Sequence, residues 1–419
     1  MGKVFKHHFL WIYFRKLEFD IEPNNAYFRW DKSYIEFTID LPETVVPDNF
    51  FASLLHENLE CRISYVTATN KTSENDYALT NYFMKRINWE ESMLHKVGVL
   101  EGIFSSKNFD ATTLKSQMAN ATESINVLNE VNTRRLNTEE IVKDDITHYR
   151  HYFRAPISCG FTWTGRPLPK DVPIKLIFFR AKAEKSVVSI VDQANDKPFS
   201  KRSLQLDNIQ LVASMITSDY YDRKYSSYRL PKIDFPYMNP IIRREVLTSG
   251  LDTFKIKISN GNLPIAMMFG LMDNSSWDGS IRESAVNFKT QNLESVDVKI
   301  DSRSLSGYPI RNHGTASIDF WRKYMTECNF LENNYSSGGL SLSDYQMYNF
   351  IICENFKRKK LYSGHLTLHL KFKTALSNTI QLVLMPITQK KLNFDENLNV
   401  TVSDMNVEAA DEVNEELES

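Results

Sequence analysis

The sequence has no closely spaced cysteines, no long apolar run and no excess of charge of one sign. Its four cysteines, Cys61, Cys159, Cys328 and Cys353, are far apart and form no CxxC pair. This spacing disfavours a zinc knuckle, a redox motif and a secreted disulfide framework, so we expect a reduced, intracellular chain. The formal net charge is -2, so the chain offers no global basic field for nucleic acid. No segment is apolar for long enough to cross a bilayer, and we predict no membrane span.

Motifs that carry catalysis are also missing. The sequence contains no GxSxG nucleophile elbow, no Walker loop and no GxGxxG after a predicted strand. Two pairs of acids, Glu139-Glu140 and Asp144-Asp145, stand in a polar stretch. A solvated helix face or loop explains them better than a general acid/base pair. We therefore expect no enzyme, and no catalytic, cofactor-binding or metal-binding residues.

Two histidine pairs resemble parts of metal sites. His365 and His369 in GHLTLHLKF would share one face of a helix. However, leucines alternate with the polar residues there, which predicts a strand, and this places the two histidines roughly 13 Å apart. One zinc ion holds each ligand nitrogen at about 2 Å, so it cannot bridge them. His148 and His151 could be ligands, or they could belong to the polar face of a strand.

One basic run, Lys357–Lys360, lies between two apolar segments. Such a run could contact nucleic acid or act as an import signal. A solvated loop is the alternative interpretation. The tryptophans are scattered, and aromatic and basic residues do not interleave as they would on a platform for single strands.

Period-two alternation dominates the chain and predicts many short strands. In the first half the predicted strands are 33–41, 60–67, 173–182, 187–191 and 204–217. In the second half they are 254–258, 263–272, 296–300, 348–353, 365–373 and 379–386. Many short strands separated by turn residues are typical of sandwiches and barrels.

Helical patterns are few. Ser73–Leu94 opens with a Ser73-x-x-Asp76 capping box, and Ile318–Cys328 is a second short helix. Apolar residues recur at steps of three and four from Leu114 to Val131, which indicates an amphipathic helix. This helix could pack at a subunit boundary or cover its own sheet. The polar region 107–147 around it is interpreted as a long insertion between strands.

The strand pattern divides the chain near 220–245, with Tyr220–Tyr237 as the connector. About eight strands on each side would suit two jelly rolls. We predict a first jelly roll at 20–219 with a helical and polar insertion near 70–147, and a second at 220–396. Residues 397–419 are acidic and almost free of aromatic residues, which predicts a disordered tail.

An ordered series of segments in the C-terminal half resembles one family. The series begins at residue 263 with LPIAMMFGLMDNSSWDGSIRESAVNFKTQNLESVDVKIDSRSL. IDFWRKYMTECNF, GGLSLSDYQMYNFIICENF and GHLTLHLKFKTALSNTIQLVLMPI follow in that order. The order is similar to the major capsid proteins of Polinton (Maverick) elements and adintoviruses. The resemblance covers 205–395, and over 30–200 it rests on strand order and on the ENDYALTNYFMKRINWEE segment.

This resemblance implies an all-β double jelly roll, in which two eight-stranded antiparallel sandwiches stand side by side. Three chains would form a pseudo-hexagonal capsomer, and capsomers would tile an icosahedral shell around double-stranded DNA. The implied partners are two further copies, neighbouring capsomers and a penton-type capsid protein, without specific nucleic-acid recognition. The implied location is the virion, assembled in the host cytoplasm or nucleus. Jelly rolls are a common architecture of viral shells.

Two other functions stay open at this stage. A jelly-roll binding module for carbohydrate or protein would need exposed aromatics beside Asp and Asn in loops, and the DNSSWDG stretch around Trp277 could supply them. A β-rich enzyme could assemble a dispersed site, such as a metal centre built on the histidines.

Overall fold

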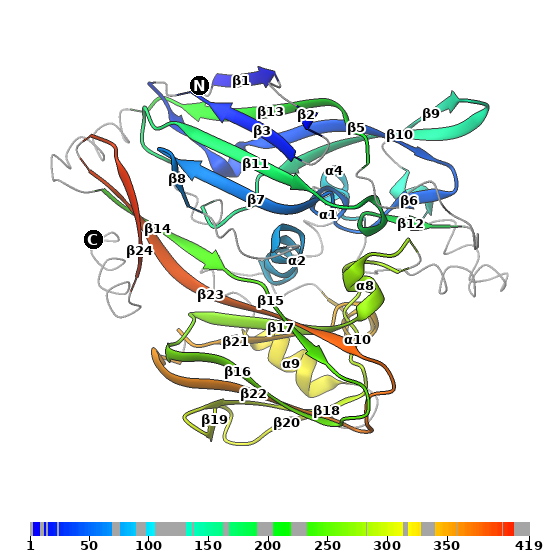
Figure 1. The fold of residues 1–419 in the computed structure, drawn as a ribbon, viewed down its shortest axis with the longest axis vertical. Coiled ribbons are helices and arrows are strands. Elements are labelled where there is room, and N and C mark those ends of the chain that lie inside the picture. Colours follow the sequence, from blue (N-terminus) through cyan, green and yellow to red (C-terminus); the bar gives the residue numbers. More distant parts are fainter. Residues whose placement is uncertain are drawn as a thin grey trace.

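The structure of this chain is a computed structural model (Figure 1). It describes residues 3–8, 12–13, 16–22, 25–68, 76–88, 98–104, 131–135, 138–161, 167–190, 204–218, 233–281, 283–312, 317–327, 340–357, 359–395 and 397–405.

Two antiparallel sheets form an N-terminal sandwich. Sheet A has the order β1 (Lys3–His8), β13 (Asp207–Ile216), β5 (Tyr34–Pro42), β10 (Ile146–Pro156) and β9 (Thr138–Lys143), with β4 (Tyr27–Phe28) beside β13. Sheet B has the order β2 (Ile12–Tyr13), β3 (Lys16–Ile21), β11 (Ile174–Arg180), β7 (His56–Ile63) and β8 (Val66–Thr67). A small ribbon joins β6 (Val45–Pro47) and β12 (Val187–Ser189).

Two further antiparallel sheets form a C-terminal sandwich. Sheet D has the order β14 (Ile233–Pro240), β23 (Ile380–Phe394), β17 (Ala266–Asp273) and β21 (Ile351–Asn355), with β15 (Arg243–Leu247) and β24 (Val400–Asp404) also paired to β23. Sheet E has the order β16 (Thr253–Asn262), β22 (Ser363–Phe372), β18 (Leu293–Ile300) and β19 (Arg303–Ser304), with β20 (Ile310–Arg311) also on β18.

The helices are short and lie mainly at the sandwich ends and at the junction. Among the described residues they are α1 (Phe51–Leu54), α2 (Asp76–Asn88), α4 (Val99–Glu101), α8 (Asn274–Asp278), α9 (Ile318–Glu327) and α10 (Leu342–Tyr348). Two 3-10 turns are η1 (Trp30–Lys32) and η4 (Ala183–Lys185). Figure 1 shows α2 between the two sandwiches.

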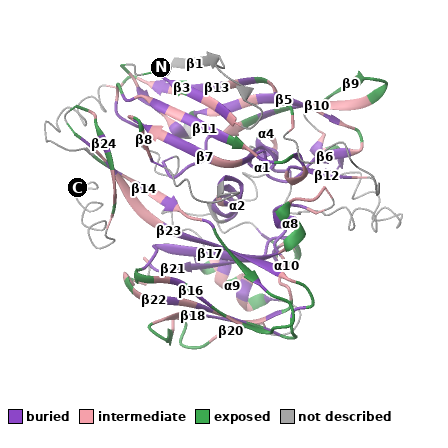
Figure 2. Cartoon of the chain, in the orientation of Figure 1, coloured by how far each residue is buried: buried purple, intermediate pink, exposed green. Residues whose placement is uncertain are grey.

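Apolar and polar residues alternate along the strands of each sandwich, so the apolar side chains of each sheet face the core. In β22, Leu366, Leu368 and Leu370 are buried while the intervening residues are more exposed. Figure 2 shows buried residues along strands such as β17 and exposed ones at turns such as that between β9 and β10. Burial of these rows contributes the main stabilisation at about 25 cal/mol per Å² of apolar surface.

The two sandwiches exchange elements across their junction. From the N-terminal half, α2 places Leu79, Tyr82 and Phe83 in the C-terminal core. In return, the C-terminal half places residues in the N-terminal core, from β14, from the end of β23 and from β24: Phe235, Tyr237, Leu392, Phe394 and Val400. Because each core contains residues from the other half, we treat the two sandwiches as one folding unit.

Most predicted strands are confirmed, and the strand of GHLTLHLKF is β22. The helices predicted at Ser73–Leu94 and Ile318–Cys328 are α2 and α9. The residues of the predicted capping box, including the Asp76 side chain, and most of the Leu114–Val131 stripe lie outside the described part of the chain. The strand predicted at 348–353 is wrong in its first residues, because α10 continues to Tyr348 and β21 begins at Ile351.

Several predicted boundaries are wrong. The N-terminal sandwich begins before residue 20, because β1 and β3 belong to its sheets. Ile233–Tyr237 of the predicted connector lies in β14, where Phe235 and Tyr237 alternate into the N-terminal core. Part of the predicted disordered tail, 400–404, is β24, because Val400 also enters that core. Within the predicted insertion, 138–147 forms most of a β9–β10 hairpin.

Candidate functional site

The paired acids of the predicted loop belong to the β9–β10 hairpin. Asp144 and Asp145 form its turn, with φ of 49° and 62°. Two successive positive φ values are typical of a type I′ hairpin turn, which Asp tolerates better than most residues. Glu139 accepts a hydrogen bond from the Tyr152 hydroxyl at 3.0 Å. Asp144 and Asp145 thus lie in a solvated turn, as the loop interpretation expected, whereas Glu139 and Glu140 lie on a strand and not on a helix face or in a loop.

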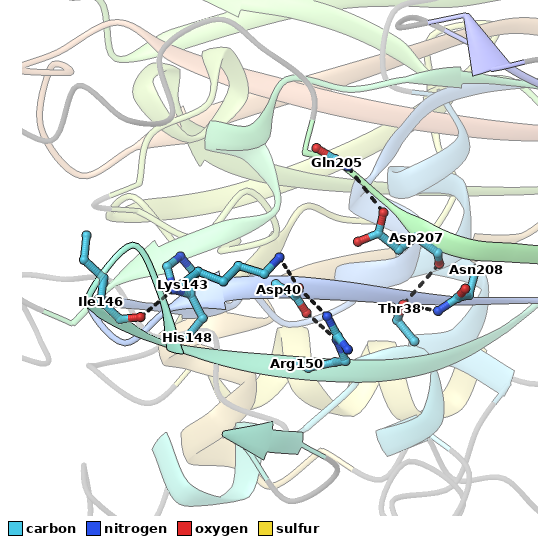
Figure 3. Close-up of polar contacts among 9 residues, drawn as sticks. All are labelled: Thr38, Asp40, Lys143, Ile146, His148, Arg150, Gln205, Asp207 and Asn208. Carbon is cyan, nitrogen blue, oxygen red and sulfur yellow. Dashed lines mark hydrogen bonds and ion pairs between the residues drawn. The ribbon is translucent and has the colours of Figure 1, made fainter. Parts of the chain in front are cut away.

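Asp40 on β5 is the centre of a charged ladder on the outer face of sheet A (Figure 3). The Arg150 guanidinium donates to both carboxylate oxygens at 2.8 and 2.9 Å, and Lys143 Nζ lies 2.5 Å from Oδ2. The Arg150 hydrogen bonds, with Lys143, lower the pKa of Asp40 to about 2 despite partial burial. A carboxylate so deeply ionised cannot serve as a proton donor near neutral pH, so this ladder is a structural clamp across three strands.

The structure separates His148 from His151. They lie three residues apart on β10, so their side chains point to opposite faces of sheet A. His151 is buried beside Phe153, and burial together with Arg135 lowers its pKa to about 3. His148 Nδ1 lies 3.0 Å from the Ile146 carbonyl oxygen. Among the described residues, no three His, Cys, Asp or Glu side chains are grouped to hold a metal ion.

The described residues of the basic run, Lys357, Lys359 and Lys360, lie in a turn between β21 and β22, as one of the two interpretations expected. Lys359 Nζ lies 2.8 Å from the Glu354 carboxylate and 3.2 Å from that of Glu327. The Glu354 side chain is only 1% exposed. A buried carboxylate needs such a partner, so Lys359 is committed to the fold.

The DNSSWDG stretch forms α8 and does not offer an exposed aromatic ring. Trp277 is buried, and the Arg244 guanidinium lies 5.1 Å from its ring centre. Asn274 donates to Asp278 at 2.9 Å. The feature that the carbohydrate hypothesis needed is therefore occupied by internal contacts.

A buried polar cluster at the junction was not found from the sequence. Asp48, after β6, is 1% exposed and accepts hydrogen bonds from the Ser284 hydroxyl at 2.9 Å and the Ala285 N–H at 3.0 Å. Arg134, which is also buried, lies 3.9 Å from it and donates to the Pro47 carbonyl. Burial raises the pKa of Asp48 to about 6, although Arg134 and the hydrogen bonds oppose the rise. This cluster joins the two halves of the chain.

Helix α2 makes the second set of contacts across the junction. The Tyr82 hydroxyl donates to Asn349 Oδ1 at 2.8 Å, and its ring stacks on Phe288 with centres 5.2 Å apart. The Tyr324 hydroxyl donates to the Arg86 carbonyl oxygen at 2.5 Å. Buried aromatic pairs of this kind stabilise by about 0.5–1.5 kcal/mol beyond their area.

A small cavity of about 20 Å³ also lies at the junction. A single water needs roughly 10–15 Å³, so the cavity has room for about one water molecule. Its volume is far smaller than that of a substrate pocket. Burial lowers the pKa of His56 at its wall, so a neutral ring packs there. The wall is made by Leu54, His56, Ala78, Leu79, Lys185, Met272, Ser276, Trp277 and Ala285. The contacts and the small cavity at the junction are suited to holding two sandwiches together.

No described helix has the length and apolar character to cross a membrane.

Comparison with solved structures gives neighbours that match nearly the whole chain. A chain of the Sputnik virophage structure superposes with a TM-score of 0.64 at 10% identity, over 96% of this chain and 88% of that one. The mavirus major capsid protein gives 0.57 at 10% identity, over 94% and 88%. A chain of the PBCV-1 virus capsid gives 0.57 at 12% identity, over 97% of both chains.

Comparisons of sequence alone give no further similar protein. No known family model matches the chain, and no curated protein matches it significantly. At such low identity the likeness concerns the fold. The predicted architecture is confirmed: the chain is an all-β double jelly roll of the kind found in the major capsid proteins of virophages and large DNA viruses.

Proposed function

We propose that this chain is the major capsid protein of a double-stranded DNA virus or of a related Polinton or adintovirus element. The observation that carries the proposal is the extent of the likeness, which spans 94–97% of this chain and 88–97% of its capsid neighbours. A match to one sandwich would have supported only a jelly-roll module, because one fold serves many functions. Here both sandwiches and the strands that join them are matched.

The junction supplies the mechanical property that a shell subunit needs. The Asp48 cluster and α2 connect the sandwiches, and β14, β23 and β24 of sheet D place residues in the N-terminal core. With each chain supplying two similar sandwiches, three chains place six around one axis and give a pseudo-hexagonal capsomer. Rigid coupling within the chain fixes the angle between neighbours in that ring.

The partners under this proposal are two further copies in the capsomer, neighbouring capsomers and a penton-type capsid protein at the vertices. The location is the virion, after assembly in the host cytoplasm or nucleus. Enclosed DNA needs no sequence-specific contact from this chain. The engagement of Lys359 with Glu354 and Glu327 supports that view, because it pairs one charge of the basic run within the chain.

Purification followed by light scattering and negative-stain electron microscopy tests the proposal. We expect a particle mass three times that of the 48.7 kDa chain and hexagonal outlines in the images. A monomer at every concentration, with no hexagonal particles, would contradict it. A stoichiometric metal ion in the purified protein would instead favour a β-rich enzyme.

The predicted helix from Leu114 to Val131 can be tested in the same assay. Changing Ile125 and Leu128 to Asp abolishes the trimer if this helix packs at a subunit boundary. An unchanged trimer mass would show that it covers its own sheet.

A further inference from the structure

The outer face of sheet E carries a group of basic residues that the capsid proposal does not use. Because β22 turns its leucines toward the core, its polar residues point away from sheet D. The strand register places Lys255, His369 and Asp297 in one row. The next row contains Lys257, Thr367 and Lys299. We call this surface the basic face, made of Lys255, Lys257, Lys299, Arg311, Lys371 and His369.

Few acids balance these charges. Lys299 lies 3.4 Å from Asp297, and Lys371 lies 2.8 Å from Glu294. Lys255, Lys257 and Arg311 have no ion pair with any residue that the structure describes. Like charges on neighbouring strands repel, so an unpaired row of lysines weakens the sheet slightly and gives it no stability in return.

The histidine in this row responds to the excess positive charge. The pKa of His369 is lowered by partial burial first, and then by Lys299 and Lys255, while Asp297 opposes them. The basic face therefore has a positive local potential, and an anionic partner would be attracted to it.

The sequence supplies an anionic partner in the segment after β24. Residues 406–419, which we call the acidic segment, contain six carboxylates and no Lys or Arg. The Met405 N–H donates to the Gln389 carbonyl at 3.1 Å, and β24 runs antiparallel to β23. The chain thus leaves β24 in the direction of the C-terminal sandwich, at the level where β23 enters it. An extended segment of this length reaches roughly 45 Å.

We propose that the acidic segment of one copy docks on the basic face of a neighbouring copy. A neighbouring copy is favoured over the same chain because β24 belongs to sheet D, whereas the basic face points away from sheet D. The same chain would have to wind around its own sandwich. The inference rests on the proposed assembly function and adds a tether between copies to it.

A peptide-binding experiment tests the contact without requiring a shell. The probe is a fluorescent peptide of residues 406–419, and the receptor is the full chain with its six tail carboxylates changed to amides. We expect binding at low salt that weakens as salt screens the charges. Lys255→Gln with Lys257→Gln should weaken it about fivefold, since exposed ion pairs contribute modestly. The matched control, Lys16→Gln with Lys175→Gln on sheet B, should change it less than twofold.

The inference is overturned if both double variants weaken peptide binding equally, or if the peptide does not bind at all. A labelled DNA duplex that binds the basic face while the peptide does not also overturns it. Light scattering on the same proteins keeps the two proposals apart. A trimer with no peptide binding removes only the tether, whereas a monomer that binds the peptide removes the capsomer and leaves the contact.

A mixing experiment tests the choice of a neighbouring copy. One variant carries Lys255→Glu and Lys257→Glu, and another carries Glu415→Lys and Glu416→Lys. Each alone should lose association beyond the capsomer, and the mixture should regain it because the reversed charges match again between chains. Recovery only when all four changes are in one chain would place the contact within a single copy and overturn the proposal.

Discussion

The two sandwiches share one architecture but treat surface charge differently. On sheet A, Asp40 is bound by Lys143 and Arg150. On sheet B, Glu18 is paired with Lys175 at 2.9 Å and also with Lys16. The outer face of sheet E instead leaves two lysines, Lys255 and Lys257, without an ion pair to any described residue.

This difference separates two roles of a charged strand residue. Cross-strand pairs on the N-terminal sandwich stabilise its own sheets by fractions of a kcal/mol each. Unpaired charges on the C-terminal sandwich do not stabilise the monomer, so they are available for contacts outside it. The comparison predicts that charge removal destabilises the first face and leaves the second almost unaffected.

The largest expected effect comes from separating the two sandwiches at α2. Phe288 is fully buried and contacts the rings of Tyr82 and Phe83 at 5.2 and 5.1 Å between centres. Phe288→Ala leaves a cavity there and should lower the free energy of unfolding by about 3–5 kcal/mol. Urea denaturation at one fixed protein concentration measures it. Tyr308→Ala, at a side chain 71% exposed, is the control and should change it by less than about 0.5 kcal/mol.

A loss below about 1 kcal/mol for Phe288→Ala would show that the junction is dispensable for stability. The two sandwiches would then be independent units, and any comparison between them would concern two separate domains.

The buried Asp48 at the junction gives the second effect, through pH. Its folded pKa of about 6 is above the ordinary value, so the folded state holds a proton that the unfolded state releases. The associated stability is present below about pH 4 and is lost as pH rises to about 6. Asp48→Asn removes this dependence, since the amide is neutral throughout. The variant should therefore gain roughly 2–3 kcal/mol relative to the wild type between pH 4 and 7.

Urea denaturation across that pH range measures the difference. At pH 4 the Asp48 side chain of the folded wild type is also uncharged, so neither protein offers Arg134 a carboxylate and their free energies of unfolding should be similar there. A constant difference between the free energies of unfolding of the two proteins from pH 4 to 7 would mean that Asp48 is ionised over the whole range.

The third effect concerns the ladder on sheet A. Asp40→Asn should lower the free energy of unfolding by about 1 kcal/mol at pH 7, after allowance for screening of Lys143 and Arg150 by solvent. Because the folded pKa of Asp40 is lowered to about 2, this stability is present above about pH 4 and is lost as pH falls toward 2. Thermal unfolding at pH 7 and pH 3 measures it. Glu36→Gln is the control, because Arg154 is 3.6 Å away and 58% exposed.

An equal loss in both variants would attribute the effect to net charge and not to the ladder. The difference between the paired charges of sheet A and the unpaired charges of sheet E would then not be explained by their ion pairs.

The sequence predicted the local fold well wherever one face of a strand is buried. The leucines of GHLTLHLKF alternate strictly, and the strand follows from that pattern alone. The same reasoning missed β14 and β24, because Pro236 interrupts β14 and the acidic composition around β24 predicted a disordered tail. Both are strands because distant residues of the N-terminal core receive Phe235 and Val400.

The junction could not be predicted from the sequence. Asp48 and Ser284 are 236 residues apart, and neither stands in a pattern that distinguishes it from ordinary loop residues. Their contact depends on how two sandwiches are placed against each other, which short-range periodicity does not encode. The family resemblance supplied the pair of sandwiches, and only the three-dimensional arrangement showed what holds them.

The smallest expected effect is on the basic face. Lys255→Gln should change the free energy of unfolding by less than about 0.5 kcal/mol, because no described partner is lost. Its local effect should nevertheless be measurable, since Lys255 contributes to lowering the pKa of His369. Removing that charge should raise the His369 pKa toward its usual value, as followed by NMR titration of labelled histidines. Lys175→Gln, on the other sandwich, should leave this titration unchanged. An unshifted pKa of His369 in the Lys255 variant would mean that this lysine adds nothing to the local potential, and the anionic partner would then have to be attracted by the other cations of the basic face, above all Lys257 and Arg311.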